Sequence, residues 1–285
     1  MEIDLSFSQS AIVMPSDHSK LRIVIVGAGG TGSFAAPAIA RLVYELKENG
    51  KAVEVMIVDP DIVESGNIPR SNFCAAEIGR SKAQTLAERI TMAWGIEAAS
   101  SCEVFDSERH LKQSASDYRN LTILVGCVDN HHARRELHRA IDEDRGYRSS
   151  EAPGLWWIDG GNGKSAGQVL IGSTTKRLKP EDHFTGTSIC HSLPAPSIVH
   201  PDLLEDQEPL RASPQAANVS CAERIRLGEQ SLNINQRVAV EIAEMLTSML
   251  LTRSLKRFAT YFDLDCGTSR SLYCTRQHVE TALEH

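Results

Sequence analysis

Six residues near the start of the chain, Gly27-Ala28-Gly29-Gly30-Thr31-Gly32, fit the pattern G-x-G-x-x-G. They follow an apolar, β-branched run and precede a segment rich in alanine and leucine. Glycines let the main chain turn tightly and approach a phosphate, and the N-terminus of a following helix supplies positive potential. A plain tight turn is the alternative, but the strand and helix context favours a nucleotide site built on Gly27, Gly29, Gly30 and Gly32.

Charged residues follow the second apolar run of the chain. Asp59 ends that run, where a carboxylate can accept hydrogen bonds from ribose hydroxyls. NAD enzymes have an acidic residue at the same place, so Asp59 does not distinguish the two classes of enzyme. Asn67, Arg70 and Lys82 come next. Fixed cations stabilise the charge that develops when a nucleophile attacks phosphorus, whereas a nicotinamide site needs none. Considered separately, Arg70 and Lys82 would be ordinary solvated surface cations. Considered together, their order and placement after the strand favour a site for a triphosphate.

Asp129 directly follows a third apolar run, Leu121 to Val128. A carboxylate at the end of a parallel strand projects toward the ligand crevice, where it can hold Mg²⁺ against phosphate oxygens. The alternative is that Asp129-Asn130 only caps the helix that follows.

These residues need a sheet to hold them together. The pattern predicts strands at 21–26 and 53–58 with a helix at 31–49 between them, which makes a parallel βαβ unit. Further predicted elements are a helix at 79–94, strands at 97–105, 121–128, 155–159 and 168–172, a helix at 131–141, a helix at 231–253 and a strand-turn-strand at 258–274.

The expected fold class is therefore α/β: a doubly wound, mostly parallel, Rossmann-like sheet with helices on both faces and a C-terminal helix plus β-hairpin. We expect one domain over 1–282, with a nucleotide-binding half at 21–165 and the C-terminal helix and hairpin at 221–275. Residues 173–220 lack periodicity and read as a long surface connection. Residues 283–285 read as a tag remnant.

The ordered motifs GAGGTGS, IVDPDIVESGNIPR, a lysine and VGCVDN resemble the ThiF/MoeB adenylation domain that ubiquitin-activating enzymes share. The likeness is strongest to ThiF-like proteins of bacterial PRTRC and ubiquitin-like operons and runs from about 21 to 272. It implies Asp59 on the ribose, Asn67, Arg70 and Lys82 on the phosphates, and Asp129 on Mg²⁺. It also implies a homodimer in which a carboxylate attacks the α-phosphate of ATP, giving an acyl-adenylate and pyrophosphate.

The chain departs from that family at three places. Ser71 stands where the family usually has Gln. The two C-x-x-C pairs of many relatives are absent, so we expect no zinc. The first helix and its exit are longer than in typical ThiF or MoeB proteins, which places Asp59 further along the chain from the glycines. The short N-terminal segment also gives no clear match for the arginine that relatives lend across the dimer, for which Arg22 is the candidate.

Some relatives transfer the acyl group to a cysteine, and Cys221 resembles that position. A thiol at a helix N-terminus is a better nucleophile, but free cysteines are more often buried packing residues. Cys190 is the second candidate, and Cys127 lies in an apolar strand and reads as core.

Composition narrows the class of protein. The 285 residues carry a formal net charge of -7, which disfavours broad nucleic-acid binding. No run approaches the roughly 18 to 20 apolar residues of a membrane helix, and the first residues lack a signal-peptide pattern. The seven scattered cysteines fit a reducing cytoplasm.

The sequence thus favours Mg-ATP-dependent adenylation of the C-terminal carboxylate of a ubiquitin-like protein, with transfer to a cysteine or to a conjugating enzyme as a further step. An NAD-dependent oxidoreductase and a non-catalytic nucleotide-binding scaffold remain the alternatives.

Overall fold

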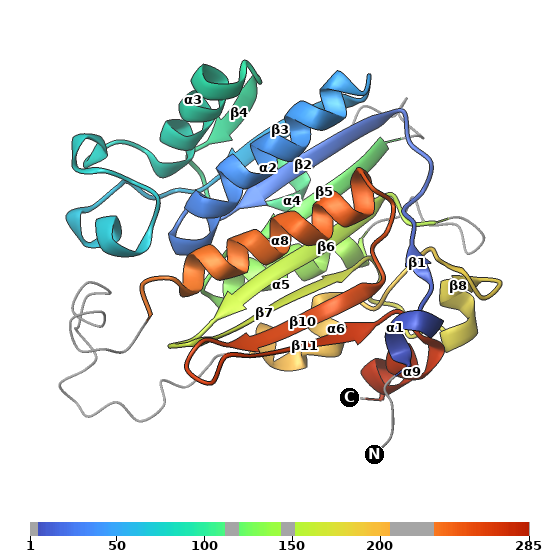
Figure 1. The fold of residues 1–285 in the computed structure, drawn as a ribbon. Helices are drawn as coiled ribbons and strands as arrows, with labels where there is room; N and C mark the ends of the chain where they lie inside the picture. Colours follow the sequence, from blue (N-terminus) through green and yellow to red (C-terminus); the bar gives the residue numbers. More distant parts are fainter. Residues whose placement is uncertain (1–4, 112–119, 144–151, 206–230, 285) are drawn as a thin grey trace.

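The computed structural model describes residues 5–111, 120–143, 152–205 and 231–284. Within them the main sheet has eight strands in the order β11-β10-β7-β6-β5-β2-β3-β4 (Figure 1). Their bounds are β2 (Lys20–Val26), β3 (Ala52–Val58), β4 (Ala98–Ser101), β5 (Asn120–Gly126), β6 (Leu155–Asn162), β7 (Ala166–Gly172), β10 (Arg257–Asp263) and β11 (Thr268–Tyr273).

Strands β4, β3, β2, β5 and β6 run parallel, and β7, β10 and β11 continue the sheet antiparallel. The chain leaves β2 toward β3 and β4 and later returns to its other side as β5 and β6. In such sheets ligands bind beyond the carboxyl ends of the strands at this reversal point. The predicted α/β, doubly wound, mostly parallel sheet is confirmed.

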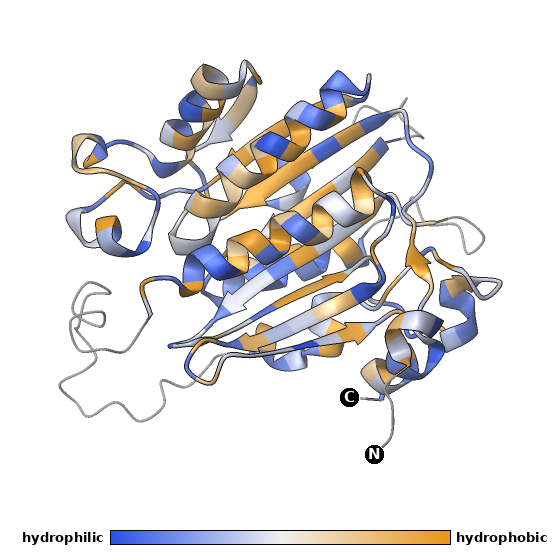
Figure 2. Ribbon diagram, in the orientation of Figure 1, coloured by the Kyte–Doolittle hydropathy of each residue, from blue (hydrophilic) through white to orange (hydrophobic). Residues whose placement is uncertain are grey.

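Helices cover both faces of the sheet. On one face lie α2 (Gly30–Glu48), α3 (Lys82–Trp94) and α8 (Ile234–Leu250), and on the other α4 (Ser107–His110), α5 (His131–Asp142) and α6 (Pro196–Val199) (Figure 1). Strands buried on both faces read as continuous apolar runs, and Figure 2 shows β2 in this state, apolar over most of its length.

A second, three-stranded sheet corrects the expectation of a long surface connection at 173–220. Strands β9 (Ile189–Cys190) and β8 (Phe184–Thr185) pair with each other, and β9 also pairs with β1 (Ile12–Val13). His183 and Leu193 in the same stretch are fully buried. Two-residue strands are too short to leave a periodic pattern, which explains the error. Residues 206–220 of that expectation lie outside the described residues.

The short elements complete the description. They are α1 (Ser6–Gln9), α9 (Arg276–Leu283) and the 3₁₀ helices Ser65–Arg70, Ala75–Glu77, Pro180–His183 and Pro201–Leu204.

Several predicted boundaries change: the strand expected at 97–105 is only β4 (Ala98–Ser101), and the helix expected at 231–253 is α8 (Ile234–Leu250). Helix α3 begins at Lys82 and not at Gly79, because Gly79 has a φ of 87° and the Ser81 hydroxyl accepts from the main-chain N–H of Gln84 to cap the helix. At the other end of the chain, Leu283 ends α9 and packs, partly buried, against the core. None of the helices in the described part of the chain has the length and apolar character to cross a bilayer.

Candidate nucleotide-binding site

The glycine turn leaves the carboxyl end of β2, where the strand order reverses. Gly27 has a φ of 91° and its N–H donates to the Val58 carbonyl over 2.9 Å. A Cβ on Gly27 would lie 2.6 Å from the Cys127 carbonyl oxygen, and one on Gly32 only 1.9 Å from the Gly27 carbonyl oxygen. Side chains at these two positions would therefore prevent the turn from closing.

Asp59 braces this turn from the end of β3. One carboxylate oxygen accepts from the main-chain N–H of Ala28 over 2.5 Å, and the other from that of Asp61 over 2.8 Å. Burial raises the pKa of Asp59, while those two donors and the nearby Lys82 ammonium oppose the rise. Sequence reasoning assigned Asp59 to a ribose and did not anticipate the bond to Ala28.

Lys82 opens helix α3 with its side chain only 9% exposed. Its Nζ forms a 2.8 Å ion pair with Asp61 Oδ2, whose side chain is 65% exposed. The cation is therefore held in place, whereas its carboxylate partner can turn into solvent.

Arg70 ends the 3₁₀ helix Ser65–Arg70, and its Nε is buried without a hydrogen-bond partner among the described residues. An unsatisfied buried donor costs roughly 1–3 kcal/mol, so a bound acceptor would stabilise this position. The same short helix holds Asn67, whose Oδ1 accepts from the Glu64 N–H over 2.9 Å, and whose carbonyl accepts from the Ser71 hydroxyl over 2.6 Å. Ser71 thus shapes the loop in place of the Gln usual in the family that the sequence resembles.

Asp129 lies beyond the end of β5 and is exposed. The capping role belongs to its neighbour, because Asn130 Oδ1 accepts from the Ala133 N–H over 2.9 Å at the start of α5. Among the described residues the carboxylate of Asp129 has no hydrogen bond or ion pair, so its oxygens can serve a ligand. The described residues contain no group of three or more His, Cys, Asp or Glu side chains that could hold a metal ion.

Asn235, near the start of α8, connects these parts and was missed from the sequence. Its Oδ1 accepts from Thr31 Oγ1 over 3.2 Å and from Asn162 Nδ2 over 2.7 Å, while its Nδ2 donates to the Arg70 carbonyl over 3.0 Å. A Cβ on Gly30 would lie 2.5 Å from the same Nδ2. The available signal was a polar residue in register with Val238 and Ile242 on the apolar face of the helix.

A buried ion pair joins α5 to β6 beneath the site. Arg134 Nε lies 3.2 Å from Asp159 Oδ2, and Asp159 is fully buried. Burial, then the charge of Asp159, raises the pKa of the neighbouring Cys127 thiol. Cys127 is therefore a core residue, as predicted.

Of the two cysteines that the sequence suggested as acyl acceptors, only Cys190 lies among the described residues. Cys190 is fully buried in β9 and its Sγ donates to the Ser192 carbonyl over 3.0 Å, which corrects its selection as an accessible acceptor. Cys221 lies outside the described residues. Arg22 lies in the central strand β2, before the glycine turn, where its guanidinium contacts Met56 Sδ at 3.6 Å.

Asp59, Arg70, Lys82 and Asp129 lie on segments that border the glycine turn, whereas Cys190 and Arg22 do not. Asp59 bonds the turn directly, and Asn235 connects it to the Arg70 carbonyl. Val128, which precedes Asp129 in the chain, would contact a Cβ on Gly27 at 3.1 Å. Lys82 lies close enough to Asp59 to influence its pKa. A glycine turn with cations and carboxylates around it can hold a phosphorylated ligand.

Comparisons with known proteins give a consistent assignment. The model of the ThiF family matches residues 15–187. Similar solved structures are PaaA, at 15% identity over 89% of this chain with a TM-score of 0.53, and E. coli MccB with AMPCPP and MccA, at 14% over 90% with a TM-score of 0.52. MccB with ATP is similar at 14% over 93% with a TM-score of 0.51.

At such identity the likeness establishes the fold. This chain covers 64% of PaaA, 64% of MccB with AMPCPP and MccA and 67% of MccB with ATP, so it spans less than two thirds of the first two. A search of curated proteins found no match.

Proposed function

Because this chain belongs to the ThiF family, we propose that it uses Mg-ATP to adenylate a carboxylate. The observation that carries the proposal is the buried Arg70 Nε, which lacks a partner among the described residues beside a glycine turn. A phosphate oxygen is the acceptor that such a nitrogen would suit. ATP in a solved MccB structure of similar fold adds support.

In the proposed reaction a carboxylate oxygen of the substrate attacks the α-phosphorus of ATP. A new O–P bond forms, the bridging bond between the α- and β-phosphates breaks, and pyrophosphate leaves with the bonding electrons. Arg70 and Lys82 stabilise the negative charge on the phosphate oxygens during the attack. The N–H groups of the glycine turn and the N-terminus of α2 hold phosphate, while Asp59 binds the ribose.

Asp129 is the residue that would hold Mg²⁺. Magnesium in nucleotide sites is usually bound by one or two carboxylates together with phosphate oxygens and waters. A single exposed carboxylate near the turn, with no bond to other described residues, fits that donor set. The metal would neutralise charge on the phosphates.

The acceptor we propose is the C-terminal carboxylate of a ubiquitin-like protein, with a homodimer as the active assembly. Transfer to Cys221, or onward to a conjugating enzyme, is the further step proposed. Loss of a trapped thioester in Cys221→Ala would support that step, and persistence of the adduct in this variant would exclude Cys221.

ATP–pyrophosphate exchange with a supplied acceptor tests the proposal. Lys82→Ala and Arg70→Ala should each lower the exchange rate by about 100-fold or more, because each removes a cation that stabilises the negative charge of the transition state. Arg80→Ala is the matched control, since Arg80 is a neighbouring cation that pairs with Glu88 at the surface.

Asp129→Asn should weaken Mg²⁺-dependent ATP binding, measured by calorimetry without any acceptor. Exchange and ATP binding that survive loss of Lys82 and Asp129 would reject the proposal. Binding of NAD in preference to ATP would favour an oxidoreductase.

A further inference from the structure

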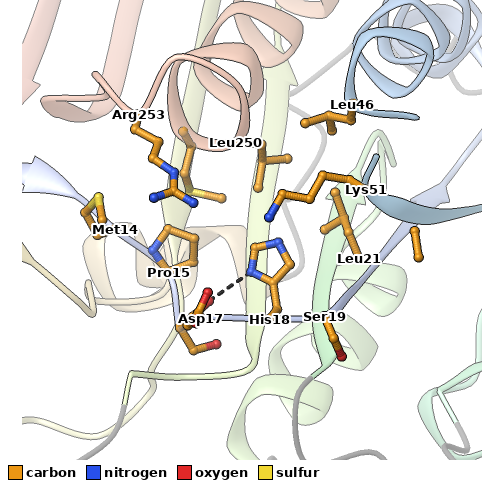
Figure 3. A pocket seen from close by; sticks show the side chains of 13 residues that line it. Met14, Pro15, Asp17, His18, Ser19, Leu21, Leu46, Lys51, Leu250 and Arg253 are labelled. Atoms are coloured by element: carbon orange, nitrogen blue, oxygen red, sulfur yellow. Dashed lines mark hydrogen bonds between the residues drawn. The ribbon is translucent and has the colours of Figure 1, made fainter. Parts of the chain in front are cut away.

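A cavity lies at the opposite end of the parallel strands from the glycine turn. Its volume is about 360 Å³, and it lies where the C-terminal ends of α2 and α8 meet residues 14–19 (Figure 3). Leu21, at the start of β2, forms part of the wall. The seven residues of β2 separate this cavity from the glycine turn, a span of roughly 20 Å. It is therefore distinct from the candidate nucleotide site.

The walls of the cavity combine apolar side chains with polar and charged ones. Met14, Leu46 and Leu250 supply apolar surface from three different segments of the chain. Figure 3 shows Lys51 and Arg253 extending into the cavity from the segments that follow the two helices. A cavity of this size that combines apolar walls with convergent polar groups is typical of a small-molecule site.

His18 adds an oriented ring to this wall. Its Nδ1 lies 2.9 Å from the Ser16 carbonyl oxygen. A carbonyl oxygen only accepts, so Nδ1 carries a proton, and the ring is fixed with its other nitrogen available to a ligand.

The two cations of the cavity form no ion pair with the described residues. Neither Lys51 nor Arg253 has a hydrogen bond from its side chain or an ion pair with a described residue. Asp17 also lines the cavity and supplies one negative charge. Two cations and one carboxylate leave a single positive charge, which matches a monoanion.

Arg253 occupies a backbone position that favours glycine. Its φ is 50°, and among the described residues it alone has a positive φ without being glycine. It follows the end of α8, where the Ser254 N–H returns to the Ser248 carbonyl over 2.8 Å, and glycine is the usual residue at such a helix end.

A cation that only offset the helix dipole could stand at Thr252 or Ser254 without this strain. Strained residues that persist are often retained for function.

We propose that this cavity binds a small organic carboxylate with an apolar body. The guanidinium of Arg253 matches a carboxylate with two parallel hydrogen bonds, and Lys51 adds a second charge. The apolar body contacts the Met14, Leu46 and Leu250 side chains, where its removal from water favours binding. The site does not depend on the proposed adenylation and ATP does not compete for it.

Isothermal titration of the full chain with octanoate tests the proposal. One octanoate should bind per chain, and Lys51→Gln should weaken its affinity at least tenfold. Octanol and octylammonium, of equal chain length, should bind far more weakly. Lys47→Gln is the matched control, because Lys47 is an exposed lysine in the last turn of α2, the helix that ends shortly before Lys51, and it should leave the affinity unchanged. Absence of octanoate binding, equal binding of octanol or full affinity in Lys51→Gln would overturn the proposal.

Arg253→Gly separates a binding role from a structural one. Glycine adopts the observed φ without strain, so the unliganded variant should melt at the same temperature as the wild type or higher. Its octanoate affinity should fall at least tenfold. A variant that melts lower and binds octanoate as the wild type does would show that Arg253 only stabilises the helix end, and would overturn the proposal.

Discussion

The side-chain amide of Asn235 donates a 3.0 Å hydrogen bond to the main-chain carbonyl of Arg70. The oxygen of the same amide accepts from Thr31 in the glycine turn. The loop that carries the Arg70 guanidinium and the turn proposed to hold phosphate are thus both bonded to one buried side chain on α8.

Asn235→Asp should weaken Mg-ATP binding. The substitution preserves shape and the acceptor oxygen but removes the donor to the Arg70 carbonyl. We expect about a tenfold loss of affinity, roughly 1.4 kcal/mol, measured by titration calorimetry. Asn162→Ala is the control, because it removes a different partner of Asn235 and leaves the bond to Arg70 in place.

The same experiment in an Arg70→Ala background shows whether Asn235 acts through Arg70. Without the guanidinium, Asn235→Asp should cause little further loss of ATP affinity. A full additional tenfold loss would contradict this role. A wild-type protein that does not bind ATP would instead contradict the proposed function.

Gly32→Ala and Gly29→Ala form a matched pair within the turn. A Cβ on Gly32 would lie 1.9 Å from the Gly27 carbonyl oxygen, whereas one on Gly29 meets nothing within 4 Å. Gly32→Ala should lower the free energy of unfolding by at least ~2 kcal/mol, and Gly29→Ala should change it by less than ~1 kcal/mol. Urea denaturation measures both, and equal losses would show that the turn relaxes around a methyl group.

Arg134→Met should be strongly destabilising, because it leaves Asp159 buried without its partner. We expect a loss of about 3–5 kcal/mol in the free energy of unfolding. The double variant Arg134→Met/Asp159→Leu should recover most of this loss in urea denaturation, and failure to recover it would mean that the two charges are not coupled. Arg139→Met on the same helix breaks a surface pair with Glu136 and should have little effect.

His183 should make the fold sensitive to acid. Burial lowers the pKa of His183 to about 4, against 6.5 for the free side chain. The unfolded chain therefore binds the proton more tightly, and the free energy of unfolding should fall by up to ~3 kcal/mol as the pH drops from about 6.5 to 4.

Urea titrations across this pH range measure the effect. His183→Gln removes the titrating group and should flatten the pH dependence, whereas His132→Gln, at an exposed position, should retain the wild-type slope. An unchanged slope in His183→Gln would contradict the assignment.

The sequence predicted the main sheet well because its strands are buried on both faces. Runs such as Leu121 to Val128 can bury their apolar side chains on both faces only inside a parallel sheet that is covered by helices on both sides. The glycine turn was equally readable, since G-x-G-x-x-G between a strand and a helix has few alternatives. Features of this kind can be predicted from a single sequence because they depend on residues that are neighbours in the chain.

Contacts across long separations were not readable. Asn235 lies 204 residues from Thr31 and 165 from Arg70, and no local pattern links them. The small sheet was missed because β8 and β9 have two residues each, too few to show a period. The structure therefore adds the tertiary bonds that orient residues whose types the sequence had already indicated.

The ion pair of Lys82 with Asp61 has a consequence for ligand entry. The lysine side chain is 9% exposed and its partner 65%, so an arriving phosphate would find the ammonium already occupied by a built-in counter-ion. Asp61 can rotate into water at little cost while the lysine stays in position. Nucleotide binding then exchanges one anion for another at Lys82. The phosphate must interact with the ammonium more strongly than Asp61 does in order to displace it.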